Sequence, residues 1–370
     1  MKFAVITHIK HLKKNGVYYS YAPYVREMNL WFQHVDEVLI VGTFSSEKPG
    51  AIDLSYRAKQ LDFRRVTDFD ILGLQSVFKT LRLLPSVLKI IYKTMQEADH
   101  IHLRCPGNMG LLGALVQVFF PHKPKTAKYA GNWKPGAKQP WSYRFQKWIL
   151  SNTFLTKNMQ VLVYGDWPGQ RKNVKAFFTA TYSEKDKEEM PKRKYDLPLR
   201  FLFVGSLSPG KQPVYALELV AELIERGFPS ELHVYGEGPE RERLNKTAKE
   251  LQIERQLFLH GNQSSEALKE AYKKSHFLML PSKSEGWPKV VAEAMWWGVI
   301  PIVTPVSCVP WMLDSGKRGV LLQMDLDSDV KRLQEQLLDK NKLKTMAAEA
   351  ASWSRNHTLE RFDAEIKKLL

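Results

Sequence analysis

The chain has 370 residues, enough for two domains, and its 44% hydrophobic and 25% charged residues exclude wholesale disorder and fibrous repeats. Its two cysteines, Cys105 and Cys308, exclude a disulfide framework and a cysteine zinc cage, and they suit a reducing cytoplasm. The formal net charge of +16 lies entirely in residues 1–195, which hold 31 Lys and Arg against 15 Asp and Glu, whereas residues 196–370 hold 24 of each.

The first half of the chain predicts one α/β domain. Short apolar runs bounded by Gly, Pro and Asn indicate buried strands, and longer amphipathic segments indicate helices. A strand, a glycine loop, a helix and a second strand open the chain, which is a βαβ unit. The expected strands are 2–7, 37–42 and 99–103, the expected helices are 21–33, 77–95 with a break at Pro85, and 109–120, and the loop holds Asn15 and Gly16.

The second half predicts another α/β domain with the same alternation, which implies a doubly wound parallel sheet. Its strands are expected from 199, then at 230–235, 256–260, 276–280, 299–303 and 319–322, and its helices at 213–227, 240–251 and 289–297.

These patterns predict two Rossmann-like, doubly wound domains that face each other across a cleft, which would be the default ligand site. The segment 183–197 is charged and contains proline, which suits a linker. The expected parts are a first domain over 1–185, a linker over 186–198, a second domain over 199–350 and a polar helical tail over 351–370.

Two carboxylates stand out in the segment 281–298, PSKSEGWPKVVAEAMWWG. Glu285 lies in the loop after a strand, and Glu293 lies about one turn inside the next helix. The free amides and the dipole of that helix start suit a phosphate, and a carboxylate one turn in can hydrogen-bond a ribose diol. From spacing alone, an equal alternative is that Glu293 favours the helix start and Glu285 is a loop charge.

A second anion loop is predicted at 205–211, GSLSPGK, between a strand and a helix. Glycine and serine amides together with Lys211 can cradle a diphosphate. Gln212 stands where a Walker motif would have the Ser or Thr that holds magnesium, so ordinary ATP hydrolysis is disfavoured.

Taken in order, VGSLSPGK, YGEGPERERL and FLMLPSKSEGWPKVVAEAMWWGVIPIVT resemble the C-terminal domain of GT-B glycosyltransferases, most closely the retaining, glycogen-synthase-like family four with its E-x7-E signature. The resemblance covers about 199–325 closely and the first domain by topology only. It implies transfer of a sugar, with retention, from a nucleotide diphosphate sugar to a hydroxyl of a glycan or lipid-linked acceptor. It also implies that the first domain handles the acceptor and that the tail helix crosses back onto it.

The resemblance assigns roles to single residues. Glu293 would bind the ribose, Glu285 would contact the donor sugar, and Lys211 would neutralise the diphosphate and its developing charge. The first-domain loop at Gly16 would close over the donor, and the loop with Asn262 would lie near the base. The remaining donor-side residues that it implies are Gly205, Ser206, Gly286, Trp287, Pro288, Lys289 and Val290.

Two departures from the family pattern affect the site. Ser206 stands where the family has an arginine, so another basic residue such as Lys289 would have to replace that charge. The family histidine near the acceptor is missing from the segment 128–133, KYAGNW. The acceptor-side candidates are therefore His102, Arg104, Asn132 and Trp133, although a strand-end histidine such as His102 is more often structural.

No metal ligand cluster is evident, and no cofactor other than the donor is expected. The pair Asp325 and Asp327 has the Asp-x-Asp spacing of metal-dependent transferases, but it precedes a polar helix and is expected to cap it. No second carboxylate suits a nucleophile, so front-face attack is implied, with the departing phosphate taking the acceptor proton.

The basic first domain predicts a polyanionic partner, with a merely solubilising surface as the alternative. No nucleic-acid module motif is present, so nucleic acid is not expected. The stretches 81–93 and 123–148 mix basic and apolar or aromatic residues and suit an anionic membrane surface. The first apolar run is too short for a signal peptide and that at 109–120 too short to span a bilayer, so a cytoplasmic protein is expected, peripheral at the inner membrane face. A catalytically silent binding protein on the same scaffold remains the alternative.

Overall fold

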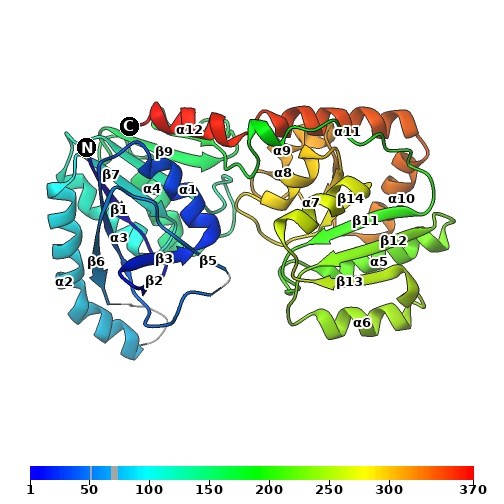
Figure 1. Ribbon diagram of the computed structural model, residues 1–370, viewed down its shortest axis with the longest axis horizontal. Helices are drawn as coiled ribbons and strands as arrows, with labels where there is room; N and C mark the ends of the chain where they lie inside the picture. The colour runs from blue at the N-terminus through cyan, green and yellow to red at the C-terminus, as the bar shows by residue number, and fades with distance from the viewer. Residues whose placement is uncertain (51, 68–73) are drawn as a thin grey trace. The chain divides into compact units, whose positions relative to one another are not determined.

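The structure is a computed structural model that describes residues 1–50, 52–67 and 74–370. The chain forms two compact units: the first unit holds Met1–Phe178 and Phe362–Leu370, and the second unit holds Thr179–Arg361. Each unit is an α/β domain around its own parallel sheet, as the sequence predicts (Figure 1).

The first unit has a seven-stranded parallel sheet in the order β10-β9-β8-β7-β1-β4-β6. The chain runs outward from the central strand β1 in both directions, so the order reverses between β1 and β7. The strands are β1 Lys2–Ile6, β4 Glu37–Thr43, β6 Gln60–Val66, β7 His100–Cys105, β8 Lys125–Tyr129, β9 Met159–Tyr164 and β10 Val174–Phe177. The helices are α1 Ala22–Phe32, α2 Leu74–Glu97, α3 Asn108–Val116, followed by the 3-10 turn η1 Gln117–Phe119, and α4 Trp141–Ser151.

Helix α2 runs through Pro85 without the expected break. Proline removes one backbone donor, but the Ser86 hydroxyl donates to the Leu83 carbonyl oxygen at 2.9 Å and keeps that turn closed. After the proline the apolar face of the helix is buried, at Val87, Ile91 and Met95.

The expected glycine loop after β1 is instead a β-hairpin. β2 His11–Lys14 and β3 Val17–Tyr21 pair antiparallel, and β3 also pairs with β5 Asp53–Ser55. Asn15 and Gly16 form the turn, with φ of 50° and 81°. Both residues adopt the left-handed backbone that a two-residue hairpin turn requires, which is why Asn-Gly is the favoured pair there.

Strand β8 is absent from the sequence prediction, which assigned its lysines to a membrane surface. The strand is buried along its whole length, and Lys125 and Lys128 are each 1% exposed. Lys125 Nζ donates to the Phe120 carbonyl oxygen at 2.7 Å, and Lys128 Nζ donates to that of Phe178 at 2.8 Å. The expected role of these two lysines at a membrane is therefore wrong, because their ammonium groups are committed to interior carbonyls.

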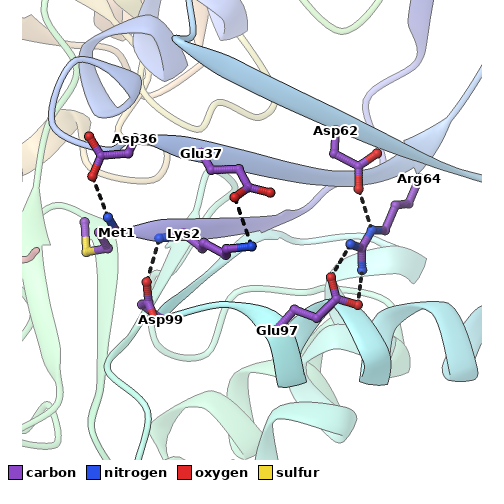
Figure 2. Close-up of polar contacts among 8 residues, drawn as sticks. All are labelled: Met1, Lys2, Asp36, Glu37, Asp62, Arg64, Glu97 and Asp99. Carbon is purple, nitrogen blue, oxygen red and sulfur yellow. Dashed lines mark hydrogen bonds and ion pairs between the residues drawn. The ribbon is translucent and has the colours of Figure 1, made fainter.

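Ion pairs join the amino ends of β1, β4 and their neighbours, as Figure 2 shows. The Met1 amino group lies 2.6 Å from Asp36, and Lys2 pairs with Glu37 at 3.0 Å. Arg64 pairs with Asp62 and Glu97 (Figure 2). Met1, Lys2 and Arg64 are thus matched by carboxylates.

The second unit has a six-stranded parallel sheet in the order β13-β12-β11-β14-β15-β16. Its strands are β11 Leu199–Val204, β12 Ser230–Tyr235, β13 Leu257–Gly261, β14 Phe277–Leu280, β15 Ile300–Val303 and β16 Val320–Leu321. Its helices include α5 Pro213–Glu225, α6 Arg241–Glu250, α7 Ser265–Lys274, α8 Lys289–Trp296, α10 Leu326–Leu337 and α11 Lys340–Arg355. Helix α12 Leu359–Lys367 begins in this unit and continues into the first unit at Phe362. The order reverses between β11 and β14, so ligands would bind between their carboxyl ends.

The expected linker and tail are distributed between the units. The first unit ends at Phe178, before residue 185, and the linker segment lies along the second unit, where Arg193 donates to the carbonyl oxygens of Ser275, Tyr272 and Trp297. The tail joins the first unit from Phe362 onward, where Phe362 packs against Phe177 and Phe178.

Candidate functional site

Lys211 and Glu285 meet at the point where the strand order of the second sheet reverses. Lys211 lies in the loop after β11, and Glu285 lies in the loop after β14. The Lys211 ammonium lies 2.5 Å from a Glu285 carboxylate oxygen, and their side chains are 27% and 10% exposed. The structure thus places a lysine and a carboxylate, both predicted site residues, at the edge where doubly wound sheets bind ligands.

The loop 205–211 packs against the loop after β12, and the two backbones come so close that a glycine is required. At Gly236, where φ is 148°, an added Cβ would lie 1.9 Å from the Gly205 carbonyl oxygen. Leu207 N–H donates to the Glu237 carbonyl oxygen, and Lys283 N–H donates to that of Gly210 at 2.8 Å. The loop that carries Lys211 is therefore fixed on both sides.

Helix α8 presents its amino end at the same edge, preceded by Gly286, Trp287 and Pro288. No side chain caps this helix end, and the Val291 N–H of its first turn donates to the Pro288 carbonyl oxygen at 3.0 Å. The amino end of a helix favours a bound anion, through its dipole and its first N–H groups. Lys289 and Val290 form this first turn and are half-buried. The Gly286 carbonyl oxygen accepts from the Ser307 hydroxyl at 3.0 Å, which fixes the entry to the helix.

Trp287 is a packing residue. It is 8% exposed and packs against Trp311, Trp353 and His357. Only its backbone can serve a ligand at the start of α8. The side chain instead anchors the loop to helix α11, which holds Trp353.

Glu293 is held by two hydroxyl groups. Thr181 Oγ1 donates to one carboxylate oxygen at 2.9 Å, and the Tyr272 hydroxyl donates to the other at 3.1 Å. Burial and the nearby Glu293 carboxylate raise the pKa of Tyr272 well above its usual value, so this hydroxyl stays protonated. The pair Thr181 and Tyr272 is missing from the sequence prediction, because neither residue lies near Glu293 in sequence.

The other predicted donor-side residues differ in placement. Gly205 continues β11 with φ of 152°, and Ser206 beside it is exposed. Asn262 is exposed in the loop after β13, at the same edge of the sheet. Gly16 belongs to the first unit, so its predicted closure over a donor stays a prediction.

The first unit has its own small hollow where its strand order reverses. His8 lies in the loop after β1, Thr43 is the last residue of β4, and Gly107 lies in the loop after β7. Together with Tyr143 they line a cavity of about 240 Å³. Burial and the nearby Arg104 guanidinium lower the pKa of His8. His8 is absent from the predicted site residues, although its position two residues after β1 places it at the carboxyl edge of the sheet.

His102 and Arg104 differ in their exposure. His102 is fully buried, and its Nδ1 lies 2.8 Å from the Thr126 hydroxyl. Arg104 pairs with Glu27 at 3.1 Å, and their side chains are 12% and 5% exposed. Burial removes the His102 side chain from the surface, whereas the predicted contact of Arg104 with an acceptor stays a prediction.

Asn132 and Trp133 lie in the loop after β8. Asn132 Oδ1 accepts from the Lys134 N–H at 2.9 Å, which closes a local turn. Trp133 is 5% exposed and donates to Gln170 at 2.9 Å. Trp133 also lines a larger cavity, described below, which differs from the hollow at His8.

Asp325 caps a helix, as the sequence predicts. Its carboxylate accepts from the Ser328 N–H at 3.0 Å at the start of α10. Asp327 is exposed, with Arg226 at 3.6 Å. Among the residues that the structure describes, no cluster of three or more His, Cys, Asp or Glu could hold a metal ion.

Residues 184–353 match the family model described as "Glycosyl transferases group 1". The D-inositol 3-phosphate glycosyltransferase of Corynebacterium jeikeium is 31% identical over 151 residues, which are 38% of this chain and 36% of that protein. The match therefore spans about a third of the length of this curated relative.

Two solved structures match almost the whole chain. Sucrose-phosphate synthase from Thermosynechococcus elongatus has a TM-score of 0.66 at 15% identity and covers 100% of this chain and 98% of its own. Anabaena Alr3699/HepE in complex with UDP has a TM-score of 0.69 at 14% identity and covers 99% and 98%. At these identities the likeness concerns the fold, and it confirms the two-domain GT-B architecture that the sequence predicts. In the described part of the chain, no helix is long and apolar enough to cross a membrane.

Proposed function

Residues 184–353 match the glycosyl transferases group 1 family and the chain has the GT-B fold, and from this premise we propose that the protein is a glycosyltransferase. It transfers a sugar from a nucleotide diphosphate sugar to a hydroxyl of a glycan or lipid-linked acceptor, with retention and without a metal ion. The observation that carries the proposal is the meeting of Lys211, Glu285 and the start of α8 at one sheet edge.

In this proposal the second unit binds the donor. The diphosphate accepts from the first amides of α8 and pairs with Lys211, and the ribose diol donates to Glu293. The loop with Asn262 lies near the base. The HepE structure is a complex with UDP, which makes a uridine nucleotide the first donor to test here.

The chemistry follows from the charge that develops when the donor breaks. The bond from the sugar C1 to the phosphate oxygen breaks, the bond from C1 to the acceptor oxygen forms on the same face, and the acceptor proton passes to the departing phosphate. Lys211 and the amides of α8 stabilise the growing negative charge, while Glu285 contacts the sugar. Ser206 cannot supply a second positive charge, and Lys289 in the first turn of α8 takes that role.

The acceptor hydroxyl belongs to the first unit in this scheme. The hollow lined by His8, Thr43, Gly107 and Tyr143 lies at the carboxyl edge of that sheet. The pKa of His8 is lowered, which keeps the imidazole neutral at pH 7. One ring nitrogen can therefore accept a hydrogen bond from a sugar hydroxyl. His8 replaces His102 as the acceptor-side histidine.

The test is a thermal-shift screen with UDP-, GDP- and ADP-sugars on the wild type and on Lys211→Ala. A donor that binds the native state raises the midpoint, and the shift should shrink in the variant. Product analysis with the best donor then separates an enzyme from the alternative, a catalytically silent binder. Binding without release of nucleoside diphosphate, with or without candidate acceptors, would favour the silent binder. No stabilisation by any nucleotide sugar would refute the donor site.

A further inference from the structure

A strongly basic cavity lies in the first unit, away from the hollow at His8. It has a volume of about 730 Å³ and is lined by the loop after β8, helix α4 and the loop before β10. Its lining contains no acidic residue. The basic side chains around it are Lys134, Lys138, Arg144, Lys147 and Arg171.

These five side chains lack the carboxylate partners that other basic residues of this unit have. Among the residues that the structure describes, none of the five has a carboxylate oxygen within 4.0 Å. In strands β1 and β6 of the same sheet, by contrast, Lys2 pairs with Glu37 and Arg64 pairs with Glu97 (Figure 2). The sequence has no acidic residue at all between Asp99 and Asp166, so the chain offers no local counter-ion.

Lys147 is held between aromatic rings rather than by a carboxylate. Its ammonium lies over the rings of Tyr129 and Trp133, at 5.6 and 5.3 Å from their centres. Burial lowers the pKa of Lys147 to about 8. A bound anion would restore the pKa, because it would favour the charged form.

An apolar groove adjoins the basic cavity. It has a volume of about 780 Å³ and lies between α2, the end of α3 with η1, and α4. Leu115 and Phe119 line it and are 40% and 71% exposed. Trp148, 55% exposed and stacked on Phe145, lines both the groove and the basic cavity.

Exposed aromatic side chains gather around this groove. Of the eight exposed large aromatic side chains in the described chain, four line the groove: Tyr92, Phe119, Phe145 and Trp148. Scattered exposed apolar residues are ordinary on a surface, but a contiguous apolar groove beside unpaired cations marks an interaction site. Aromatic and basic side chains together are the composition of a membrane-interface surface.

We propose that the groove and the basic cavity form one site for an anionic phospholipid of a membrane. The phosphate of the headgroup lies among the five basic side chains, and an acyl chain lies along the groove, with Trp148 at the junction. A soluble phosphate would leave the groove empty, and an apolar peptide would leave the cations unpaired. The site uses no donor-binding residue, so the inference goes beyond the proposed transfer reaction and does not depend on it.

The test is co-sedimentation with vesicles of phosphatidylcholine, with and without phosphatidylglycerol. The wild type should bind only the anionic vesicles, and less as salt rises. Lys138→Gln with Arg144→Gln should weaken binding about 25-fold, since each charge is worth roughly fivefold, or about 1 kcal/mol. Leu115→Ser with Phe119→Ser should also weaken binding, with all cations retained.

The matched control is Lys274→Gln with Leu338→Ser in the second unit, which removes an exposed cation and a 77% exposed apolar side chain elsewhere. It should bind vesicles like the wild type. A normal thermal midpoint for each variant separates lost binding from unfolding, and the thermal shift with a nucleotide sugar reports the donor site separately.

Two further outcomes decide the identity of the occupant. Soluble short-chain phosphatidylglycerol should raise the thermal midpoint more than glycerol 3-phosphate does; equal shifts would show that the groove takes no part and would overturn the proposal. Wild-type protein that stays in the supernatant at low salt would also overturn it. So would vesicle binding that falls with the charge variant but not with Leu115→Ser and Phe119→Ser.

Discussion

Replacing Glu285 by glutamine should strengthen the binding of a free nucleoside diphosphate, whereas replacing Lys211 by alanine should weaken it. The Lys211 ammonium lies 2.5 Å from a Glu285 carboxylate oxygen. A diphosphate that pairs with Lys211 would therefore lie close to a second negative charge. Glu285→Gln keeps the shape of the side chain and removes that repulsion.

The magnitude follows from Coulomb's law. Two charges about 6 Å apart repel by about 0.7 kcal/mol in water and by about 2.8 kcal/mol at an effective dielectric constant of 20. The side chains of Lys211 and Glu285 are 27% and 10% exposed, which places the site between these limits. A gain of about 1 kcal/mol is about fivefold in affinity. Lys211→Ala loses a charged hydrogen bond, worth roughly 1.5–3 kcal/mol or about 10–100-fold.

Titration calorimetry at fixed salt, with the nucleoside diphosphate of the best donor, measures both effects. Glu349→Gln removes an exposed carboxylate of α11 and should leave the affinity unchanged. Glu285→Gln should nevertheless lower turnover, because the carboxylate contacts the sugar in the proposed reaction. Weaker diphosphate binding in Glu285→Gln, comparable with that of Lys211→Ala, would refute the reasoning and would make Glu285 a brace for the lysine.

Other predictions concern the same site, the fold and the reaction. Glu293→Gln should weaken nucleoside diphosphate binding about 10–100-fold by calorimetry, since it removes a charged hydrogen bond but keeps the shape. Gly236→Ala should abolish that binding and lower the thermal midpoint more than Gly227→Ala, whose added Cβ would meet nothing within 4 Å. Burial lowers the pKa of His11 and His100 to about 4. As the pH falls, these histidines therefore become protonated in the unfolded chain before they do in the folded chain. The free energy of unfolding, measured with urea, should then fall as the pH drops from about 6.5 to about 4. The fall should be up to about 1.4 kcal/mol per pH unit for each histidine. Transfer activity should survive EDTA, and a complete loss that manganese restores would contradict metal independence.

The sequence by itself determined the α/β alternation and the placing of Glu285 in a loop and Glu293 in the helix that follows it. Strands such as 277–280 are short apolar runs, and their partners such as α8 carry an apolar stripe, so local periodicity reports both. The spacing of Glu285 and Glu293 is also local, because one strand end and one helix turn fix it. At Asn15 and Gly16 only a glycine loop was predicted, although Asn-Gly is a strong hairpin signal and the structure has a hairpin there.

Burial of charged residues was decided by the tertiary structure. The β8 sequence KTAKY looks like a solvated basic segment, yet Lys125 and Lys128 reach the carbonyl oxygens of Phe120 and Phe178. No pattern along the chain reports whether a distant carbonyl will lie within reach of an ammonium group. The burial of His102 was also decided by the tertiary structure, because apolar character does not distinguish the two faces of a buried strand.

The contacts that position the site are also tertiary. Lys211 and Glu285 are 74 residues apart, and Thr181 and Glu293 are 112 residues apart. The basic cavity and the apolar groove meet at Trp148 only because α4 packs between the loop after β8 and helices α2 and α3. Local sequence sets which elements form and which chemical groups each one carries. Parallel pairing of strands far apart in the chain then sets which groups meet, because it gathers their carboxyl ends at one edge.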